Sequence, residues 1–144
     1  MLRSMTFLAA MFAASAGLAE GPATTYDYDG SFDDAAFALE NAIVGKGLVI
    51  DYVTHTGDML ARTAADVGSD VELFEAADVY LFCSAVVSRE VMEADPMNLA
   101  FCPYGIFVAE RDGGVMLGYQ NYPEGPMQKV QALLDDIVQD ALGN

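Results

Sequence analysis

The sequence predicts a single α+β domain in which an antiparallel or mixed sheet of about five strands carries helices mainly on one face. Segments with strand character alternate with segments of helical periodicity, in the order β-α-β-(α)-β-α-β-β-α. The last two strand-like segments flank Arg111-Asp112-Gly113-Gly114, a hairpin signal because Asp-Gly and Gly-Gly accept the positive φ angles of tight turns. An apolar stripe at helical spacing then closes the chain.

The first 19 residues have the composition of a cleavable export signal. Arg3 provides a short positive start, the next uncharged stretch is apolar, and Gly17-Leu18-Ala19 places small residues where a signal peptidase reads them. The segment is too short to span a membrane, which takes about 20 apolar residues. We therefore expect a mature domain of residues 20–144 that is periplasmic or secreted, without stable membrane insertion after cleavage.

The mature domain is expected to be strongly acidic. Removing residues 1–19 changes the net charge from −16 to −17, with 22 carboxylates and five Lys and Arg left in 125 residues. Such a surface repels nucleic acid, because phosphate binding needs clustered cations. It would attract cationic partners, and a chain of this length has room for one core and one domain.

The first strand and helix have clear signals. Ala23–Gly30 alternates in the manner of a strand that is buried on one side. Ser31 stands where a helix N-cap is expected, and the acidic residues after it favour the positive end of a helix. Apolar residues then recur at helical spacing until Gly45, which provides the stop.

The middle of the chain carries two further strands and a weaker helix. Leu48–His55 is expected as the second strand, with the choice of buried side left open. The periodicity that follows is weak and favours a short helix over Asp58–Val67. Asp78–Ala85 is a nearly continuous apolar run, which indicates a strand inside the sheet and not at its edge.

The remaining elements follow from capping and turn residues. Val86–Ala94 is expected as a helix, capped by Ser84 or Ser88 and ended at Asp95-Pro96, because the residue before proline avoids helical geometry. The hairpin strands are predicted over Tyr104–Glu110 and Val115–Tyr122. The terminal helix begins near Pro126 and carries an apolar stripe of Met127, Val130, Leu133, Leu134, Ile137, Val138 and Ala141.

Cys83 ends one predicted strand and Cys102 lies just before the next. The 18 residues between them comprise a helix that advances roughly 15 Å and an extended return through Asn98 that covers up to about 30 Å. The chain can therefore bring Cys102 back to the Cα separation of about 4.4–6.8 Å that a disulfide requires. In an oxidising compartment this predicts a structural disulfide, which stabilises by about 3 kcal/mol in the chain-entropy model.

The alternative is a periplasmic metal-binding or thiol-redox site. Cys83, Cys102, His55, Met92 and Met97 are soft or borderline ligands that would suit copper or another late transition metal. Their spacing matches no C-x-x-C or H-x-x-x-H signature, and methionines often fill cores. The disulfide interpretation predicts no cofactor.

Enzyme templates lack their parts in this sequence. It has one histidine and contains no G-x-S-x-G, no P-loop and no glycine-rich dinucleotide fingerprint. Asp135 and Asp136 are neighbours on a predicted helix, so they point in different directions and are expected on its solvated face. The sequence thus favours a role without catalysis. Tyr80, Tyr104 and His55 are the candidate binding residues, because tyrosine joins apolar area to a polar end; packing against the sheet is the other interpretation of both tyrosines.

The stretch EADPMNLAFCPYGIFVAERDGG, with its Ala-Asp-Pro, Pro/Cys pair and Val-rich strand, resembles the DUF302 family, also described as the TT1751-like fold, over about residues 23–122. Two features depart from the family pattern. Cys83-Ser84-Ala85 replaces a Cys-Asn-Pro, and Pro103 follows Cys102 where the family has proline before the cysteine. The resemblance implies a small α+β domain, often dimeric, without an established activity.

We therefore expect an exported, acidic binding or interaction module. It is expected to form a homodimer, as the resemblance implies, with a cationic periplasmic protein or a small ligand as possible further partners.

Overall fold

The computed structural model describes residues 21–144, so the predicted signal segment lies outside the described residues. These residues contain one five-stranded sheet in which every neighbouring pair of strands is antiparallel. Its strand order is β1-β5-β4-β3-β2, made of β1 (Ala23–Tyr28), β2 (Ile50–Thr54), β3 (Ala76–Phe82), β4 (Tyr104–Arg111) and β5 (Gly114–Gln120). The predicted α+β class and the order of elements are confirmed, and β3 is an internal strand as expected.

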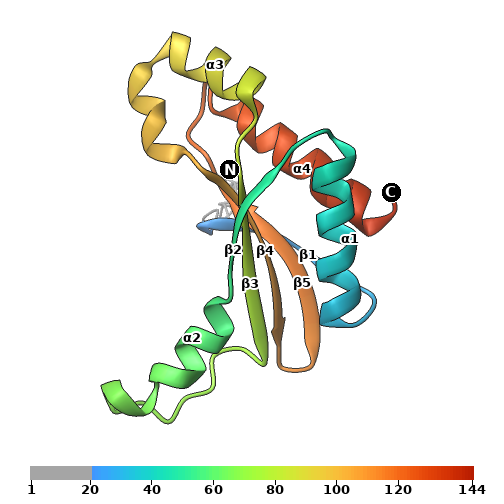
Figure 1. Ribbon diagram of the computed structural model, residues 1–144, viewed down its shortest axis with the longest axis vertical. Helices are drawn as coiled ribbons and strands as arrows, with labels where there is room; N and C mark the ends of the chain where they lie inside the picture. The colour runs from blue at the N-terminus through green and yellow to red at the C-terminus, as the bar shows by residue number, and fades with distance from the viewer. Residues whose placement is uncertain (1–20) are drawn as a thin grey trace, which may run out of the picture.

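The helices are distributed over both faces and one end of the sheet (Figure 1). They are α1 (Phe32–Gly45), α2 (Thr56–Thr63), α3 (Ala85–Ala94) and α4 (Gln128–Leu142), with short 3-10 helices η1 (Ala65–Val67) and η2 (Pro96–Phe101). Helices α1 and α4 cover one face together, whereas α2 lies on the other side, and α3 with η2 forms an arch beyond the sheet (Figure 1). Within residues 21–144, no helix has the length and apolar character needed to cross a bilayer.

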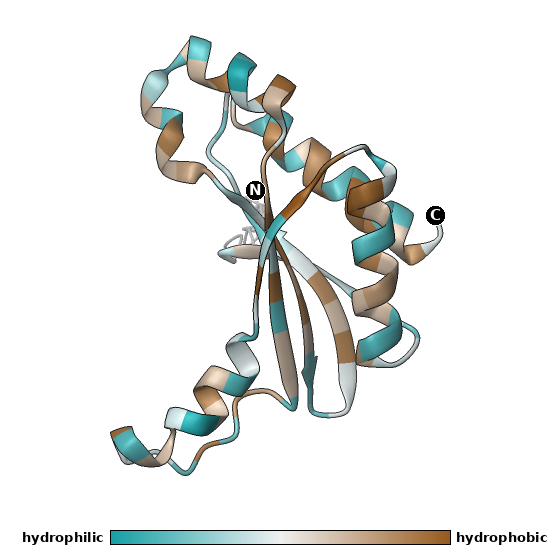
Figure 2. Ribbon diagram, in the orientation of Figure 1, coloured by the Kyte–Doolittle hydropathy of each residue, from teal (hydrophilic) through white to brown (hydrophobic). Residues whose placement is uncertain are grey.

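The core lies between the sheet and the pair α1 and α4. Alternate strand residues point into it, and polar and apolar residues alternate along both helices (Figure 2). Each fully buried aliphatic or aromatic side chain stabilises the fold by about 1.5–3 kcal/mol. The fully buried members of the core include Leu39, Ile43, Phe82, Tyr104, Ile106, Val108, Leu117, Val130, Leu134, Ile137 and Val138.

Both ends of α1 are fixed by side chains. The Ser31 hydroxyl accepts a hydrogen bond from the Asp34 amide at 3.1 Å, as the capping pattern predicts. Beyond the other end, the Lys46 ammonium lies 2.6 Å from Asp136 and 2.8 Å from Asp140, both in α4. These ion pairs are partly exposed, so water screens them and each contributes little to stability. They tie the end of α1 to the helix packed beside it.

The edge strand β2 does not follow a regular alternation. Its pairing with β3 contains a shift between Ile50 and Tyr52, where a bulge places an extra residue. As a result Ile50 and Val53 both pack against the core, although strict alternation would place them on opposite faces. The sequence left open which side of β2 is buried. Because of the bulge, the buried residues of β2 do not follow one alternating set.

The segment after Asp95 differs from the extended return that the sequence predicted. It forms η2, which begins with Pro96 and ends at Phe101. The Asp95 carboxylate accepts a hydrogen bond from the Met97 amide at 2.9 Å, and proline at the first position suits a helical start. A capped turn therefore replaces extended chain, and the prediction for this segment was wrong.

Candidate functional site

Cys83 and Cys102 lie side by side at one end of the sheet. Phe82 in β3 pairs with Tyr104 in β4, so Cys83 follows one partner and Cys102 comes shortly before the other. Their sulfur atoms are 2.9 Å apart and both side chains are half-buried. Both are free thiols in this structure, whereas a disulfide bond is about 2.05 Å long.

The chain between the cysteines forms the arch, defined here as residues 84–101 and comprising α3 and η2. Ser84, not Ser88, caps α3, and its hydroxyl accepts a hydrogen bond from the Val87 amide at 3.3 Å. Asn98 donates from its side chain to the Val91 carbonyl at 2.8 Å and joins the two limbs of the arch. The two sulfur atoms meet at its base.

A polar pair lies next to the sulfur atoms. The hydroxyl groups of Ser88 and Tyr104 are 2.9 Å apart, and the Ser88 oxygen is 3.9 Å from the Cys102 sulfur. Burial is the main cause that raises the pKa of Tyr104 above its ordinary value. Ser88 was considered only as a helix cap, and the structure instead gives it a contact with a buried tyrosine.

Aromatic rings close the inner side of this region. Tyr122 packs edge-on against Tyr104, with ring centroids 6.4 Å apart, and lies 5.8 Å from the ring of Phe101. Its hydroxyl group is buried without a hydrogen-bond partner. Burial raises the pKa of Tyr122 to about 12. The surroundings of Cys102 are therefore apolar on this side.

The environment of Cys83 disfavours the thiolate. Burial first, and then the hydrogen bond with Cys102, raise the pKa of Cys83 to about 11. A thiol of this kind is almost fully protonated at neutral pH and is a poor nucleophile, because the thiolate is the reactive form. The arrangement is suited to joining two sulfur atoms, and unsuited to attack by Cys83 on an external substrate.

The structure does not bring His55 to the cysteines. His55 precedes α2, and its Nδ1 atom lies 2.9 Å from an Asp78 carboxylate oxygen. Asp78 and Cys83 are five residues apart along β3 and its end, a separation of about 17 Å at the rise of a strand. Met97 is 73% exposed on η2, and Met92 of α3 packs against the core. Among residues 21–144 no group of three or more His, Cys, Asp or Glu side chains is placed to hold a metal ion.

The two tyrosines proposed as binding residues lie in the core. Tyr80 is 6% exposed and Tyr104 is fully buried. Sheet packing, the other interpretation of these residues, describes their positions. Two other tyrosines, Tyr26 and Tyr119, donate hydrogen bonds to the same oxygen of Asp135 at 2.6 and 2.7 Å. Asp135 was expected on a solvated helix face, so the sequence missed this cluster.

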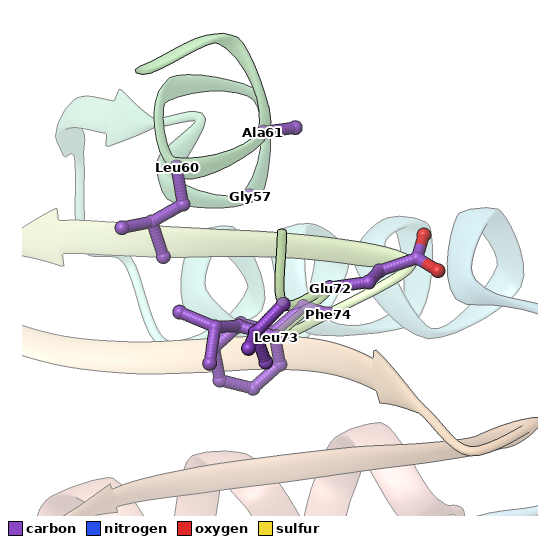
Figure 3. A pocket seen from close by; sticks show the side chains of 7 residues that line it. Gly57, Leu60, Ala61, Glu72, Leu73 and Phe74 are labelled. Carbon is purple, nitrogen blue, oxygen red and sulfur yellow. The ribbon is translucent and has the colours of Figure 1, made fainter. Parts of the chain in front are cut away.

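A small apolar cavity of about 40 Å³ lies between α2 and the segment 71–74 (Figure 3). Leu60 of α2 points toward Leu73 and Phe74, and the carboxylate of Glu72 points away from them (Figure 3). Sites for drug-sized ligands have volumes of about 300–1,000 Å³. This cavity is too small for such a ligand and has the size of a packing defect.

Comparison with known proteins places the chain in a family. The sequence profile described as "Domain of unknown function DUF302" matches residues 23–142. The crystal structure of an uncharacterized conserved DUF302 protein from Bacillus stearothermophilus is similar in fold, with a TM-score of 0.59 and 15% identity over 85% of this chain and 91% of that chain. No curated protein matches the sequence. The profile match spans most of the chain, including both cysteines, and the protein therefore belongs to the DUF302 family.

Proposed function

We propose that this protein is an exported, acidic binding module that works as a homodimer and in which Cys83 and Cys102 form a structural disulfide. The observation that carries the disulfide is the 2.9 Å separation of the two sulfur atoms across the base of the arch. Joining them takes a movement of less than 1 Å. Export would supply the oxidising environment in which such a bond forms and persists.

A disulfide would add a covalent constraint here. The buried Val91 side chain and the hydrogen bond between Ser88 and Tyr104 already hold the arch. Its ion pair with the rest of the domain joins Glu90 to Lys129 of α4 at 2.6 Å, and both side chains are about half exposed. Such a pair contributes at most about 1 kcal/mol. Closing the 18-residue loop with a disulfide contributes about 3 kcal/mol in the chain-entropy model. The bond would therefore fix the shape of the arch more strongly than this ion pair does.

Export and acidity support a binding role together. The segment 1–19 has the charge and apolar pattern of a signal peptide, and the remaining chain has a net charge of −17. This charge would attract a cationic periplasmic partner, and a small ligand is a further possibility. The homodimer is inferred from the resemblance to the family.

The test is a thiol count on protein purified from its own exported compartment. The protein is denatured without reductant and treated with an alkylating reagent, and its mass is measured. The proposal predicts no alkylated cysteine and a loss of 2 hydrogen masses relative to the reduced chain. Two alkylated cysteines, with metal retained in the native mass spectrum, would instead support a metal-binding or thiol-redox accessory protein using Cys83 and Cys102.

Reduction provides an independent measurement. Addition of a phosphine reductant is expected to lower the melting temperature of the wild type by several degrees, since about 3 kcal/mol of loop-closure stabilisation is lost. The double variant Cys83→Ser/Cys102→Ser is the matched control and should melt at the same temperature with and without reductant. Equal melting temperatures for the oxidised and reduced wild type would contradict a structural role for the bond.

A further inference from the structure

The sheet face opposite α1 and α4 is built from side chains that the core does not use. We call it the open face. Pairing places its residues in rows across the strands: Val79 lies opposite Thr54 and Phe107, and Phe107 lies opposite Gly118. Its members are Thr25, Tyr52, Thr54, Ala77, Val79, Leu81, Gly105, Phe107, Ala109, Met116 and Gly118.

The open face is apolar and hollowed. Val79, Leu81, Phe107 and Met116 are half-buried and lie outside the core between sheet and helices. A shallow hollow of about 390 Å³ is lined by Val79, Leu81, Gly105 and Phe107, with Pro22, Ala23, Pro103 and Gln120 at its margin. Two glycines allow neighbouring side chains to lie close to the sheet. A Cβ at Gly105 would lie 3.2 Å from Leu81, and one at Gly118 would lie 2.4 Å from the Phe107 ring.

Charge is almost absent from this face. Apart from Arg111 at the hairpin end of β4, the positions that β3, β4 and β5 contribute to the open face carry no charged side chain. Asp27 on the edge strand β1 and Arg111 at the hairpin lie at its margins. In a chain of net charge −16, an uncharged surface of this size lets two copies meet while most of their carboxylates stay apart.

A projecting segment extends the face on the same side. We call residues 56–75 the arm; it comprises α2, η1 and the following coil, and it extends away from the sheet (Figure 1). Gly57 packs directly on the open face, since a Cβ there would lie 2.6 Å from the Ala77 backbone nitrogen. Val67, Val71 and Leu73 of the arm are 76%, 61% and 50% exposed. The arm thus offers apolar side chains that a second copy can cover.

The area of the open face can be compared with that of known interfaces. Five strands spaced about 4.8 Å apart, with five to eight residues at about 3.4 Å each, give a flat face of roughly 500 Å². A standard interface buries about 800 Å² on each partner. The exposed aliphatic residues of the arm add to the area of the open face.

We propose that the open face and the arm form the contact between two copies of this chain, related by a two-fold axis. The inference rests on the homodimer in the proposed function and names its surface. A two-fold axis places the same nearly uncharged sheet face on both partners, so the sheet part of the contact brings few like charges together. The arm contributes the exposed side chains of Val67, Val71 and Leu73 to the contact. The arm also carries charged residues, which the contact has to leave in water: Asp58, Arg62, Asp66, Asp70, Glu72 and Glu75.

The test is sedimentation equilibrium of the mature protein at 50 and 500 mM NaCl. We expect a dimer whose association constant increases at the higher salt concentration, because salt screens the repulsion between two chains of like charge. Phe107→Glu, in the centre of the open face, should weaken association at least 100-fold. Tyr52→Glu should weaken it about 10-fold; this side chain is 64% exposed, so the variant should fold normally. Phe37→Glu, on the exposed side of α1, is the control and should leave association unchanged.

The results of this experiment distinguish the homodimer from the surface proposed for it. A wild type that stays monomeric at both salt concentrations would overturn the homodimer and its surface, whereas the disulfide of the proposed function would stand or fall on the thiol count alone. A dimer that both open-face variants leave intact would overturn the surface and keep the homodimer. Association that weakens with salt would also overturn it and indicate a contact through opposite charges. If Phe107→Glu fails to fold by circular dichroism, Tyr52→Glu decides the question.

Discussion

Tyr26 in the edge strand β1 donates a hydrogen bond to Asp135 in α4, 109 residues later in the chain. Tyr119 in the neighbouring strand β5 donates to the same carboxylate oxygen. One side chain of α4 thus accepts from two strands, on the face of the sheet that the helices cover. Hydrogen bonds to charged acceptors are about twice as strong as neutral ones, so this cluster fixes α4 against β1 and β5.

Replacement of Asp135 should destabilise the fold strongly. In Asp135→Ala both tyrosine hydroxyl groups lose their acceptor, and Tyr119 is only 3% exposed. We expect the free energy of unfolding to decrease by about 2–4 kcal/mol in urea titrations. The neighbouring Asp136→Ala removes one partly exposed ion pair with Lys46 and should lower the free energy of unfolding much less than Asp135→Ala does. Equal losses in the two variants would show that the tyrosine cluster has no special role.

The same tyrosines predict a loss of stability at alkaline pH. The hydrogen bond to Asp135 raises the pKa of Tyr26, and burial raises the pKa of Tyr119, in both cases above the ordinary value near 10. A folded-state pKa above the unfolded value means that this stabilisation is complete below about pH 10 and is lost as the pH rises further.

Urea unfolding between pH 8 and 11.5 measures this dependence. The free energy of unfolding should be flat up to about pH 9.5 and then fall steeply. Tyr119→Phe should be less stable at pH 8 and should show a shallower fall. A wild type whose stability is constant to pH 11.5 would contradict the prediction.

Cys83 should react slowly in the reduced, folded protein. Its pKa is raised to about 11, chiefly by burial, so little thiolate exists at pH 8. Alkylation of native Cys102→Ser with iodoacetamide is expected to be at least 10-fold slower at pH 8 than alkylation of the same chain in urea. The rate in the native protein should still be rising above pH 10. A native rate that levels off near pH 8.5 would mean that the environment of Cys83 is not desolvating.

Gly118 cannot accept a side chain without movement of its neighbours. A Cβ there would lie 2.4 Å from the Phe107 ring and 2.8 Å from the Thr24 carbonyl oxygen. Gly118→Ala should therefore lower the free energy of unfolding by about 1–3 kcal/mol, as overpacking does. Gly45→Ala is the control, since a Cβ at the end of α1 meets nothing within 4 Å. A neutral Gly118→Ala would show that the ring of Phe107 moves freely.

The sequence predicted the elements with strong local signals. Ser31 and the residues after it specified the start of α1, and Asp112-Gly113 specified the hairpin, where both residues have positive φ. The approach of Cys83 and Cys102 was also anticipated, because chain length and strand pairing limit where the loop can end. These features depend on neighbours in sequence or on loop length alone.

Features that depend on distant contacts were not predictable. The bulge at Ile50 and Tyr52 depends on pairing with β3, and the role of Asp135 depends on tyrosines that come from two other strands. A carboxylate on an amphipathic helix is usually solvated, so no local signal marks Asp135. η2 was missed for a different reason: the Asp95 cap was taken only as the end of a helix, and it also begins the next.

The pairing of β1 with β5 has a consequence for how the chain acquires its structure. Thr24 in β1 lies opposite Tyr119 in β5. The strand that pairs with β1 is therefore synthesised late, and only α4 follows it in the chain. During synthesis about four-fifths of the chain must leave the ribosome before β1 has a partner, and such long-range closure slows folding. β1 therefore stays without its sheet partner through most of synthesis, and the five-stranded sheet is completed only when β5 has left the ribosome.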